Sequence, residues 1–239
     1  MNFFQKIRLK LIYISAKKLF CENIGGHYVR VKDIKNNKVI VDLGANKAAF
    51  SIAMNRIFNT YSICVEANKQ LFEKLPEYNW LKKEYAVCGA KDGSEEFIIS
   101  YNDEASSIYP EIANVWDTKS KHIVPSISLQ TLIKKYSNLK ISYLKIDIEG
   151  AEIDVLKYTP NDTLLAIPQI GVEFHEYLSD KFFNDTKEVL TKMHKIGFYS
   201  IITSSSKYAE VLFLNKNQIH FSLSDKLWYA FHKVVAYSA

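Results

Sequence analysis

The chain has 239 residues, of which 48% are hydrophobic and 24% are charged, and its formal net charge is +5. This length and composition predict one globular domain, or one domain with an extension, with enough apolar residues for a full core. The modest charge forms no dense basic stripe, which argues against nucleic-acid binding, and no apolar run approaches the ~18 residues that a transmembrane helix needs.

Residues 1–33 are predicted to form a basic amphipathic extension, ahead of a main domain over residues 34–239. Only basic charges precede the first acid, Glu22. The apolar residues that can share one helical face are Phe3, Phe4, Ile7, Leu11, Ile14, Leu19 and Phe20. A helix over residues 1–23 either packs on the domain with solvated lysines or contacts an anionic membrane surface. Residues 225–237 have a similar pattern, and the same two alternatives apply to them.

Strand and helix patterns alternate between these two ends of the chain. Helices are expected at residues 48–58, 69–75, 129–135, 152–156 and 185–196, the last closed by Gly197. Strands are expected at residues 39–43, 61–66, 84–87, 97–100, 143–148, 170–174, 198–203 and 210–214. The alternation predicts a Rossmann-like α/β fold, with a seven-stranded, mostly parallel sheet and helices on both faces. A polar turn at residues 204–207 joins the last two strands, which indicates an antiparallel hairpin at the sheet edge.

The three cysteines, Cys21, Cys64 and Cys88, match no zinc-binding spacing. They are predicted to be buried reduced thiols, which indicates a reducing compartment. The predicted location is therefore cytoplasmic, and the membrane alternative would add peripheral contact with the inner membrane.

Acidic residues end the first two expected strands, where ligands bind in parallel sheets. Gly44 lets the backbone turn tightly beside a ligand. A buried Asp42 needs hydrogen bonds from loop amides or from a ligand's ammonium group. Glu66 ends the next strand, where an acid can accept both ribose hydroxyls of a nucleoside. Each acid alone could equally be a helix cap or a loop contact, but together they favour a nucleoside cofactor. The loop holds one glycine, which argues against a dinucleotide.

The strand expected at residues 143–148 carries a second group of charged residues. Lys145, Asp147 and Glu149 alternate with apolar residues, so we expect them on one side, near the carboxyl end. Compensation of the next helix's dipole is enough to explain Glu149 and Glu152. It does not explain Lys145 or Asp147 inside an apolar strand, and these two are therefore site candidates.

The strand expected at residues 170–174 runs into Glu173 and His175. His175 either takes a proton from a substrate hydroxyl or is a surface loop histidine. Asp147, Glu149, Glu173 and His175 also offer ligand atoms to a divalent metal. We predict no metal, because spacing along one sequence does not show that these side chains converge.

These residues together resemble the FkbM-type methyltransferases, a class I family that uses S-adenosylmethionine. The family's first motif is similar to residues 42–51, and its acidic strand end is similar to Glu66. Its most specific signature resembles residues 144–152, and its Glu-x-His pattern is similar to Glu173 and His175. The resemblance extends over residues 39–214, most of the chain.

The resemblance implies methyl transfer from S-adenosylmethionine to a hydroxyl on a sugar or other glycan-like metabolite. The residues that would hold the cofactor are Asp42, Gly44, Ala45, Asn46, Phe50, Glu66, Ala86, Ser107 and Asp147. The residues that would serve catalysis are Asp147, His175, Glu149, Glu173 and Lys145. Within this set, His175 or Asp147 would be the base, and Glu173 and Glu149 would orient it. Residues 102–124 and the two terminal segments would select the small-molecule or glycan acceptor.

The family pattern is broken at three positions, where this chain has Lys47, Ala48 and Ala67. Ala48 replaces a glycine, and its methyl group would take room near the methionine part of the cofactor unless φ is negative there. Two alternatives therefore stay open. One is a catalytically weak or inactive relative that keeps the fold as a binding or partner subunit. The other is a sugar-nucleotide oxidoreductase or epimerase, against which the glycine-poor loop argues.

Overall fold

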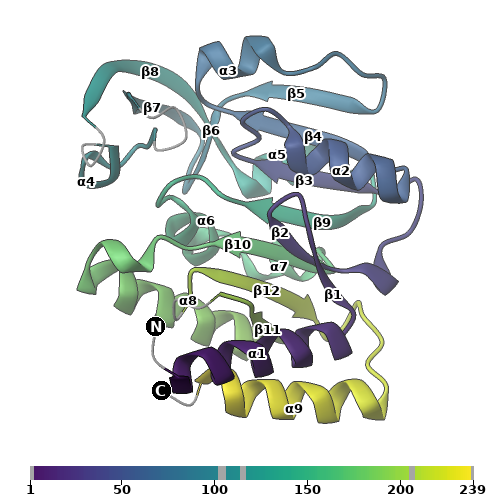
Figure 1. Cartoon of the computed structure of the whole chain (residues 1–239). Helices are drawn as coiled ribbons and strands as arrows, with labels where there is room; N and C mark the ends of the chain where they lie inside the picture. Colours follow the sequence, from purple (N-terminus) through teal and green to yellow (C-terminus); the bar gives the residue numbers. More distant parts are fainter. Residues whose placement is uncertain (1–2, 102–105, 114–116, 205–207, 238–239) are drawn as a thin grey trace.

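The computed structural model describes residues 3–101, 106–113, 117–204 and 208–237. Its centre is a seven-stranded sheet with the order β11-β12-β10-β9-β3-β4-β5 (Figure 1). The strands are β3 (Val39–Leu43), β4 (Tyr61–Glu66), β5 (Leu81–Tyr85), β9 (Ile141–Ile146), β10 (Gln169–Glu173), β11 (Phe198–Ile202) and β12 (Glu210–Asn215). β12 runs antiparallel to β10 and β11, and the other neighbouring pairs are parallel. The predicted seven-stranded, mostly parallel sheet with an antiparallel edge hairpin is confirmed.

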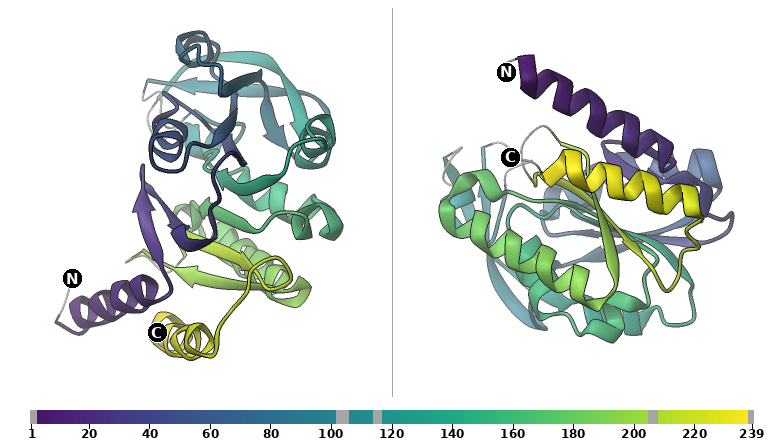
Figure 2. Two further views of the ribbon diagram at one scale, coloured as in Figure 1. Left: turned by 90° about the vertical axis from the view of Figure 1, so that its right-hand side faces the viewer. Right: turned by 90° about the horizontal axis from the view of Figure 1, so that it is seen from below.

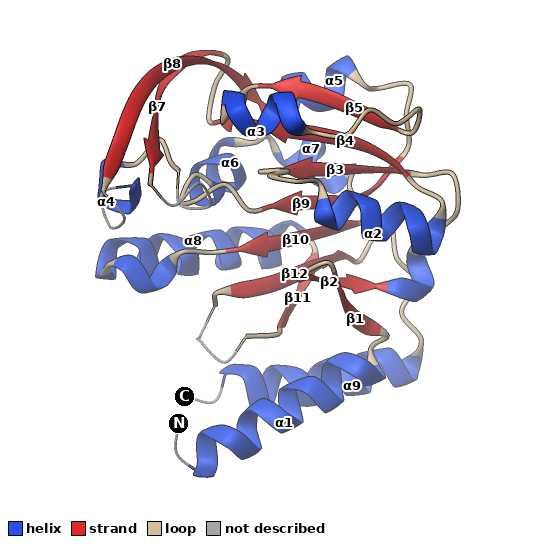
Figure 3. Cartoon of the chain, turned by 45° about the horizontal axis from the view of Figure 1, so that its top comes forward, coloured by secondary structure: helices blue, strands red, loops and turns tan. Residues whose placement is uncertain are grey.

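Helices cover both faces of this sheet, as predicted (Figure 3). On one face lie α5 (Leu129–Lys135), α6 (Glu152–Tyr158), α7 (Asn161–Leu165) and α8 (Asp180–Ile196). On the other face lie α2 (Ala49–Phe58) and α3 (Lys69–Lys74). Along β3, Val41 and Leu43 pack toward the first group of helices, whereas Ile40 packs with α2. This period of two places Asp42 and Lys145 on the same face as α2.

Two predicted strands end differently in the structure. The strand expected at residues 84–87 spans the end of β5 and the start of β6 (Val87–Gly89), which belongs to a second sheet. That sheet has the order β6-β8-β7, with β7 (Gly93–Ser100) and β8 (Thr118–Ser128), and α4 (Pro110–Ala113) lies between these two strands in the chain. β9 ends at Ile146 rather than at residue 148, because Glu149 and Gly150 take positive φ values of 52° and 99°. Glu149 is therefore in a loop, and not in the first turn of α6.

The N-terminal part differs from the predicted helix over residues 1–23. α1 (Phe3–Lys18) ends earlier, and a hairpin of β1 (Cys21–Ile24) and β2 (His27–Arg30) follows, with the short 3-10 helix η1 (Val31–Asp33) after it. Gly25 and Gly26 make the turn with φ values of 56° and 100°, the left-handed conformations that a two-residue hairpin turn requires.

The hairpin lies against β10 and β12 of the main sheet. The hydroxyl of Tyr143 on β9 donates a hydrogen bond of 2.8 Å to the carbonyl of Tyr28. Gly171 on β10 leaves room for this tyrosine, because a Cβ there would lie 1.8 Å from the Tyr143 hydroxyl oxygen. The domain boundary after residue 33 stays a prediction, but the hairpin before it is anchored directly to the sheet.

α1 and α9 (Leu223–Tyr237) lie side by side outside the β11 edge (Figure 2). The guanidinium of Arg8 donates to the carbonyls of Val235 and Ala236, at 3.2 and 2.6 Å. Among the described residues, no helix has both the length and the apolar character needed to cross a membrane.

Local signals fix other parts of the fold as expected. Gly197 closes α8 with a φ of 118°. α8 begins five residues earlier than predicted, after Ser179, whose hydroxyl accepts the amide of Phe182 at 3.3 Å. The 3-10 helix η4 (Glu176–Leu178) precedes it. The three cysteines are free and buried, as predicted. Residues 205–207 of the predicted turn and residues 102–105 and 114–116 of the predicted specificity region lie outside the described residues.

Candidate active site

A cavity of about 580 Å³ lies at the carboxyl ends of β3, β4, β9 and β10. Its size is typical of small-ligand sites, and its position is where open parallel sheets bind ligands. The main sheet contributes the loop after β3, Glu66 from β4, Asp147 from the segment after β9 and Glu173 from β10. The hairpin contributes Gly25, Gly26 and His27. Residues from four adjacent strands and the N-terminal part thus share one cavity.

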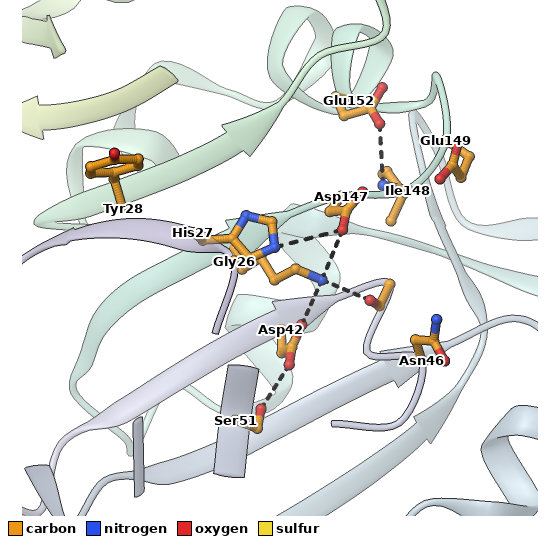
Figure 4. Close-up of polar contacts among 12 residues, drawn as sticks. Gly26, His27, Tyr28, Asp42, Asn46, Ser51, Asp147, Ile148, Glu149 and Glu152 are labelled. Atoms are coloured by element: carbon orange, nitrogen blue, oxygen red, sulfur yellow. Dashed lines mark hydrogen bonds and ion pairs between the residues drawn. The ribbon is translucent and has the colours of Figure 1, made fainter. Parts of the chain in front are cut away.

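Lys145 is the charged centre beneath this cavity. Its ammonium lies 3.2 Å from Asp42 Oδ1, 3.3 Å from Asp147 Oδ2 and 2.8 Å from the carbonyl oxygen of Gly44 (Figure 4). Burial alone would lower the pKa of Lys145, but the two aspartates outweigh it and the net pKa is raised. Lys145 is therefore a buried ammonium that joins the ends of β3 and β9.

Asp42 is fully buried and does not line the cavity. Besides Lys145, it accepts a hydrogen bond of 2.8 Å from the hydroxyl of Ser51 on α2. The structure thus gives Asp42 partners within the chain rather than a ligand contact. Its predicted role in holding the cofactor is, in this geometry, to fix Lys145 and the start of α2.

Gly44 makes the tight turn that the sequence predicts, with a φ of 75°. A Cβ at this position would lie 1.8 Å from the backbone oxygen of Asp147. The glycine is therefore required for close approach of the β3 loop to the chain after β9, as well as for forming the cavity wall. The amide of Asp147 donates to the carbonyl of Leu43 at 3.2 Å, which closes the same junction.

Glu66 and Asn46 form the β4 side of the cavity. The two carboxylate oxygens of Glu66 accept the backbone amides of Asn46 and Asn68, each at 2.8 Å. Burial raises the pKa of Glu66, and these amides oppose that rise. Asn46 has a φ of 48°, and its buried Oδ1 has no hydrogen-bond partner among the described residues. An unpaired buried acceptor beside a cavity is suited to a ligand that donates an N–H or O–H.

Ala48, which replaces the family glycine, has a φ of 58° at the N-terminus of α2. Ala48 therefore lacks the negative φ that was expected to keep its methyl group away from the cofactor. Its backbone is instead in the left-handed region that glycine favours. Its methyl group packs in a cluster with Ala45, Cys64 and Leu75, and it does not line the cavity. Ala48 therefore costs backbone strain without taking ligand space, whereas Lys47 does line the cavity.

His27 lies over Asp147, with 3.6 Å between His27 Nε2 and Asp147 Oδ2 (Figure 4). Burial and the charge of Lys145 lower the pKa of His27 to about 4, so the imidazole is neutral near pH 7. The contact is therefore polar and not an ion pair. For Asp147, burial would raise the pKa, but the positive charges of Lys145 and His175 lower it overall. Sequence reasoning missed His27, because it assigned the residue to an extension.

His175 is held between two carboxylates. Its Nε2 lies 3.0 Å from Glu149 Oε2, and its Nδ1 lies 3.0 Å from Glu152 Oε1. Burial would lower the pKa of His175, but Glu152 and Glu149 raise it to about 12. A protonated imidazole cannot accept a proton, so this geometry does not favour the predicted role of His175 as a base. It favours a positioning role, in which His175 ties the Glu149 loop to β10.

Glu173 and Glu210 face each other as cross-strand partners on β10 and β12. Burial and nearby negative charge together raise the pKa of both carboxyls to about 7, and the negative charge comes from Asp147 for Glu173 and from Glu173 for Glu210. Glu173 lines the cavity. It is therefore a cavity carboxyl that can accept a proton near neutral pH.

The remaining predicted cofactor residues divide into two groups. Ala45, Phe50 and Ala86 line the cavity, whereas Ser107 does not. The Ser107 hydroxyl donates to the carbonyl of Glu149 at 2.5 Å and so supports that loop. Its neighbours Ser106 and Ile108 line the cavity; both lie in the predicted specificity region, and neither was predicted to hold the cofactor.

In the part of the chain that the structure describes, two sets of side chains bring ligand atoms within 4.8 Å of one another. The first is His27, Asp147 and Glu173, and the second is Asp147, Glu149 and His175. Glu173 thus joins a different set from the one that holds His175. The ammonium of Lys145 and the protonated His175 place positive charge beside both sets, which opposes binding of a cation. The predicted lack of a metal stays a prediction.

Comparisons with known proteins place this site in a family. No curated protein matches the sequence. Similar solved structures include M. capricolum TrmK in complex with S-adenosyl-homocysteine, with 11% identity over 93% of this chain and 73% of that chain and a TM-score of 0.41. The precorrin-6y C5,15-methyltransferase of Geobacter metallireducens has 10% identity over 86% of each chain and a TM-score of 0.38.

The human methyltransferase 10 domain containing protein has 9% identity over 87% of this chain and 81% of that chain, with a TM-score of 0.40. The family model described as the methyltransferase FkbM domain matches residues 42–199, which is more than half of the chain. This match spans the Asp42 loop, Lys145, Asp147 and His175, and the chain belongs to the FkbM methyltransferase domain family.

Proposed function

We propose that the protein transfers a methyl group from S-adenosylmethionine to a hydroxyl oxygen, on a sugar or another polyhydroxylated small molecule. The supporting observation is that one cavity holds Glu66 and Asn46 on its β4 side and Glu173 on its β10 side. β3 and β9 lie between them in the sheet. At ~4.8 Å per strand, the two groups are about 14 Å apart, which leaves room for a nucleoside donor beside a small acceptor.

The residues on the β4 side fit a nucleoside. The carboxylate of Glu66 keeps acceptor capacity beyond its two backbone amides, which suits ribose hydroxyls. The unpaired Oδ1 of Asn46 suits a ligand N–H or ammonium donor. S-adenosylmethionine, when bound, would supply a methyl carbon that is electrophilic because it is attached to a sulfonium.

On the β10 side, the chain's own residues would hold the acceptor and remove its proton. We assign Glu173 as the general base, because it lines the cavity and its pKa of about 7 matches the working pH. The neutral His27 and the ionised Asp147 would orient the hydroxyl by hydrogen bonds. Positioning of donor and acceptor can contribute about 7–11 kcal/mol to the lowering of the barrier.

The test has a binding arm and a transfer arm. Calorimetric titration with S-adenosyl-homocysteine should show binding to the wild type and equally to Glu173→Gln. In transfer assays with a panel of sugar acceptors, Glu173→Gln should lower kcat by roughly 10²–10⁴-fold. Glu188→Gln, at an exposed carboxylate of α8, is the control and should leave both unchanged. If Glu173→Gln kept the wild-type kcat, Glu173 would not be the general base.

The same titration and transfer assays distinguish this function from the two alternatives, a partner subunit and a sugar-nucleotide oxidoreductase or epimerase. The partner-subunit alternative rested on Ala48 and Lys47, and the methyl of Ala48 points out of the cavity. Binding of NAD without binding of S-adenosyl-homocysteine would favour the oxidoreductase alternative and overturn the proposal. Binding of S-adenosyl-homocysteine without transfer to any acceptor would favour the partner subunit.

A further inference from the structure

α1 and α9 form a two-helix layer (Figure 2, right). We call the side of this layer that points away from the sheet the terminal-helix face. The helices run antiparallel, because Arg8 near the start of α1 contacts the last turn of α9, at Val235 and Ala236. Farther along, the hydroxyl of Ser15 lies 2.8 Å from His232 Nδ1. The two helices are thus fixed to each other by buried polar contacts.

The residues of α1 that pack inward are not the apolar residues singled out in the sequence. The inward face consists of Ile12, Ser15 and Ala16. Phe3 and Phe4 are 71% and 79% exposed. The predicted apolar stripe of α1 therefore points largely to solvent, and packing on the domain does not explain it.

α9 exposes a matching stripe. Leu223, Leu227 and Val234 are 75%, 65% and 66% exposed, and their spacing of four and seven residues puts them on one helical face. The buried residues of this helix, Asp225, His232 and Ala236, lie on the opposite side. The exposed apolar side chains of both helices thus belong to one continuous layer, beyond what scattered surface leucines produce.

The charges on the terminal-helix face are of one sign. The exposed basic residues are Lys6, Lys10, Lys17, Lys18, Lys226 and Lys233. α1 contains no acidic residue. The single acid of α9, Asp225, is buried and paired with Arg30 and Lys32, at 2.9 and 3.0 Å. The face therefore combines exposed apolar groups with uncompensated positive charge.

We propose that the terminal-helix face binds the surface of an anionic lipid bilayer. Apolar side chains on helices that lie in the membrane plane enter the boundary between headgroups and acyl chains, while lysines reach the headgroups. A second copy of this chain fits less well, because its own face carries the same lysines and the two would repel. A neutral protein groove would satisfy the apolar stripe but leave the lysines without partners.

The test uses the full chain and vesicles of two compositions. In flotation assays, the wild type should bind vesicles of phosphatidylcholine mixed with phosphatidylglycerol, and should bind phosphatidylcholine alone far more weakly. Lys226→Gln with Lys233→Gln should weaken binding by roughly tenfold or more. Leu227→Ser with Val234→Ser should weaken it by a similar factor. Raised salt should weaken wild-type binding, because the headgroup attraction is screened.

Matched controls carry the same changes elsewhere on the surface. Lys74→Gln with Lys134→Gln, and Ile57→Ser on α2, should bind as the wild type does. The proposal would be overturned if the wild type bound neither kind of vesicle. It would also be overturned if the control variants lost as much binding as the variants of the terminal-helix face. A dimer in analytical ultracentrifugation that the Leu227→Ser and Val234→Ser changes abolish would also overturn it, because the occupant would then be a second copy.

Discussion

Two pairs of carboxylates at the sheet edge where β3, β9 and β10 end differ in how their charge is compensated. On the β3 and β9 side, Asp42 and Asp147 share the ammonium of Lys145, at 3.2 and 3.3 Å. On the β10 and β12 side, Glu173 and Glu210 face each other, and within the described residues neither has an ion-pair partner. The pKa of Asp147 is lowered, whereas the pKa values of both glutamates are raised to about 7.

This difference separates a structural role from a reactive one. The Lys145 group keeps a fixed charge over the whole range of neutral pH, so it can hold two strand ends in place. The glutamate pair changes its protonation within that range, so it can exchange a proton with a substrate. The fixed cation keeps Asp147 ionised, and a carboxylate oxygen of Asp147 lies within 4.8 Å of one of Glu173.

Removal of the cation should have the largest effect on stability. In Lys145→Met, the buried Asp42 loses its counter-charge, and the free energy of unfolding should fall by about 3–5 kcal/mol. Urea denaturation measures this change. Lys145→Met combined with Asp42→Asn should recover part of the loss, because no buried charge is then left at Asp42. A single variant that loses less than about 1 kcal/mol would show that the ammonium is not needed for compensation.

The titrating pair should make stability depend on pH. In the folded protein both carboxyls keep their proton up to about pH 7, whereas an unfolded glutamate loses it near about pH 4.3. Between these values the folded state binds more protons, so the free energy of unfolding falls as pH rises. Glu210→Gln should lessen the fall between pH 5 and pH 8, by on the order of 2 kcal/mol.

Urea denaturation at the two pH values gives this difference. The same variant should also lower the pKa of Glu173, and thus shift the rise of the transfer rate with pH to lower pH. Parallel stability curves for the variant and the wild type would mean that Glu210 carries the same charge in the folded and unfolded states over this range, so that folding does not raise its pKa.

The negative charge of Glu66 is compensated in a third way, by hydrogen bonds from two backbone amides. Glu66→Gln replaces one acceptor oxygen by an NH₂ group that faces an amide donor, so the ribose contact should weaken. Affinity for S-adenosyl-homocysteine in calorimetric titration should fall by roughly 10–100-fold, which corresponds to about 1.5–3 kcal/mol. Glu73→Gln, on the exposed side of α3, should not change the affinity. An unchanged affinity in Glu66→Gln would place the nucleoside elsewhere.

The smallest effect is expected at Ala48, whose backbone strain involves neither the Lys145 group, nor the glutamate pair, nor Glu66. Ala48→Gly should relieve the left-handed conformation but lose the burial of one methyl group, which contributes about 0.8 kcal/mol. The free energy of unfolding should therefore change by less than about 1 kcal/mol, with no change in affinity for S-adenosyl-homocysteine. A tenfold gain in affinity would show that the methyl group does reach the ligand.

The strands of the main sheet could be predicted because each is a short apolar run that local burial explains. β3, with all five residues buried, is the clearest case. β8 could not be predicted in this way, because most of residues 118–128 are exposed or half-buried and the strand forms through its pairing with β7 and β6. Its register depends on partners that lie far away in the sequence.

The site residues were predictable where they follow a strand end directly, as Asp147 and Glu173 do. Their chemical states were not, because these depend on contacts across strands. His175 is charged because Glu149 and Glu152 converge on it, and the pKa of Glu173 is raised to about 7 because the carboxyl is buried and lies near Asp147. His27 could have been found from Gly25 and Gly26, since two glycines between short strand-like segments are a hairpin signal.

Because of the close contact between Tyr143 and Gly171, we expect substitutions at these two positions to occur together. Any side chain at position 171 would collide with the Tyr143 hydroxyl, which supports the carbonyl of Tyr28 in the hairpin next to His27. Natural variants should therefore keep this pair or lose both members at once. In a double-mutant cycle, Tyr143→Phe should lessen the damage caused by Gly171→Ala, since it removes the atom in the way. Homologues without the N-terminal hairpin should be free of this constraint.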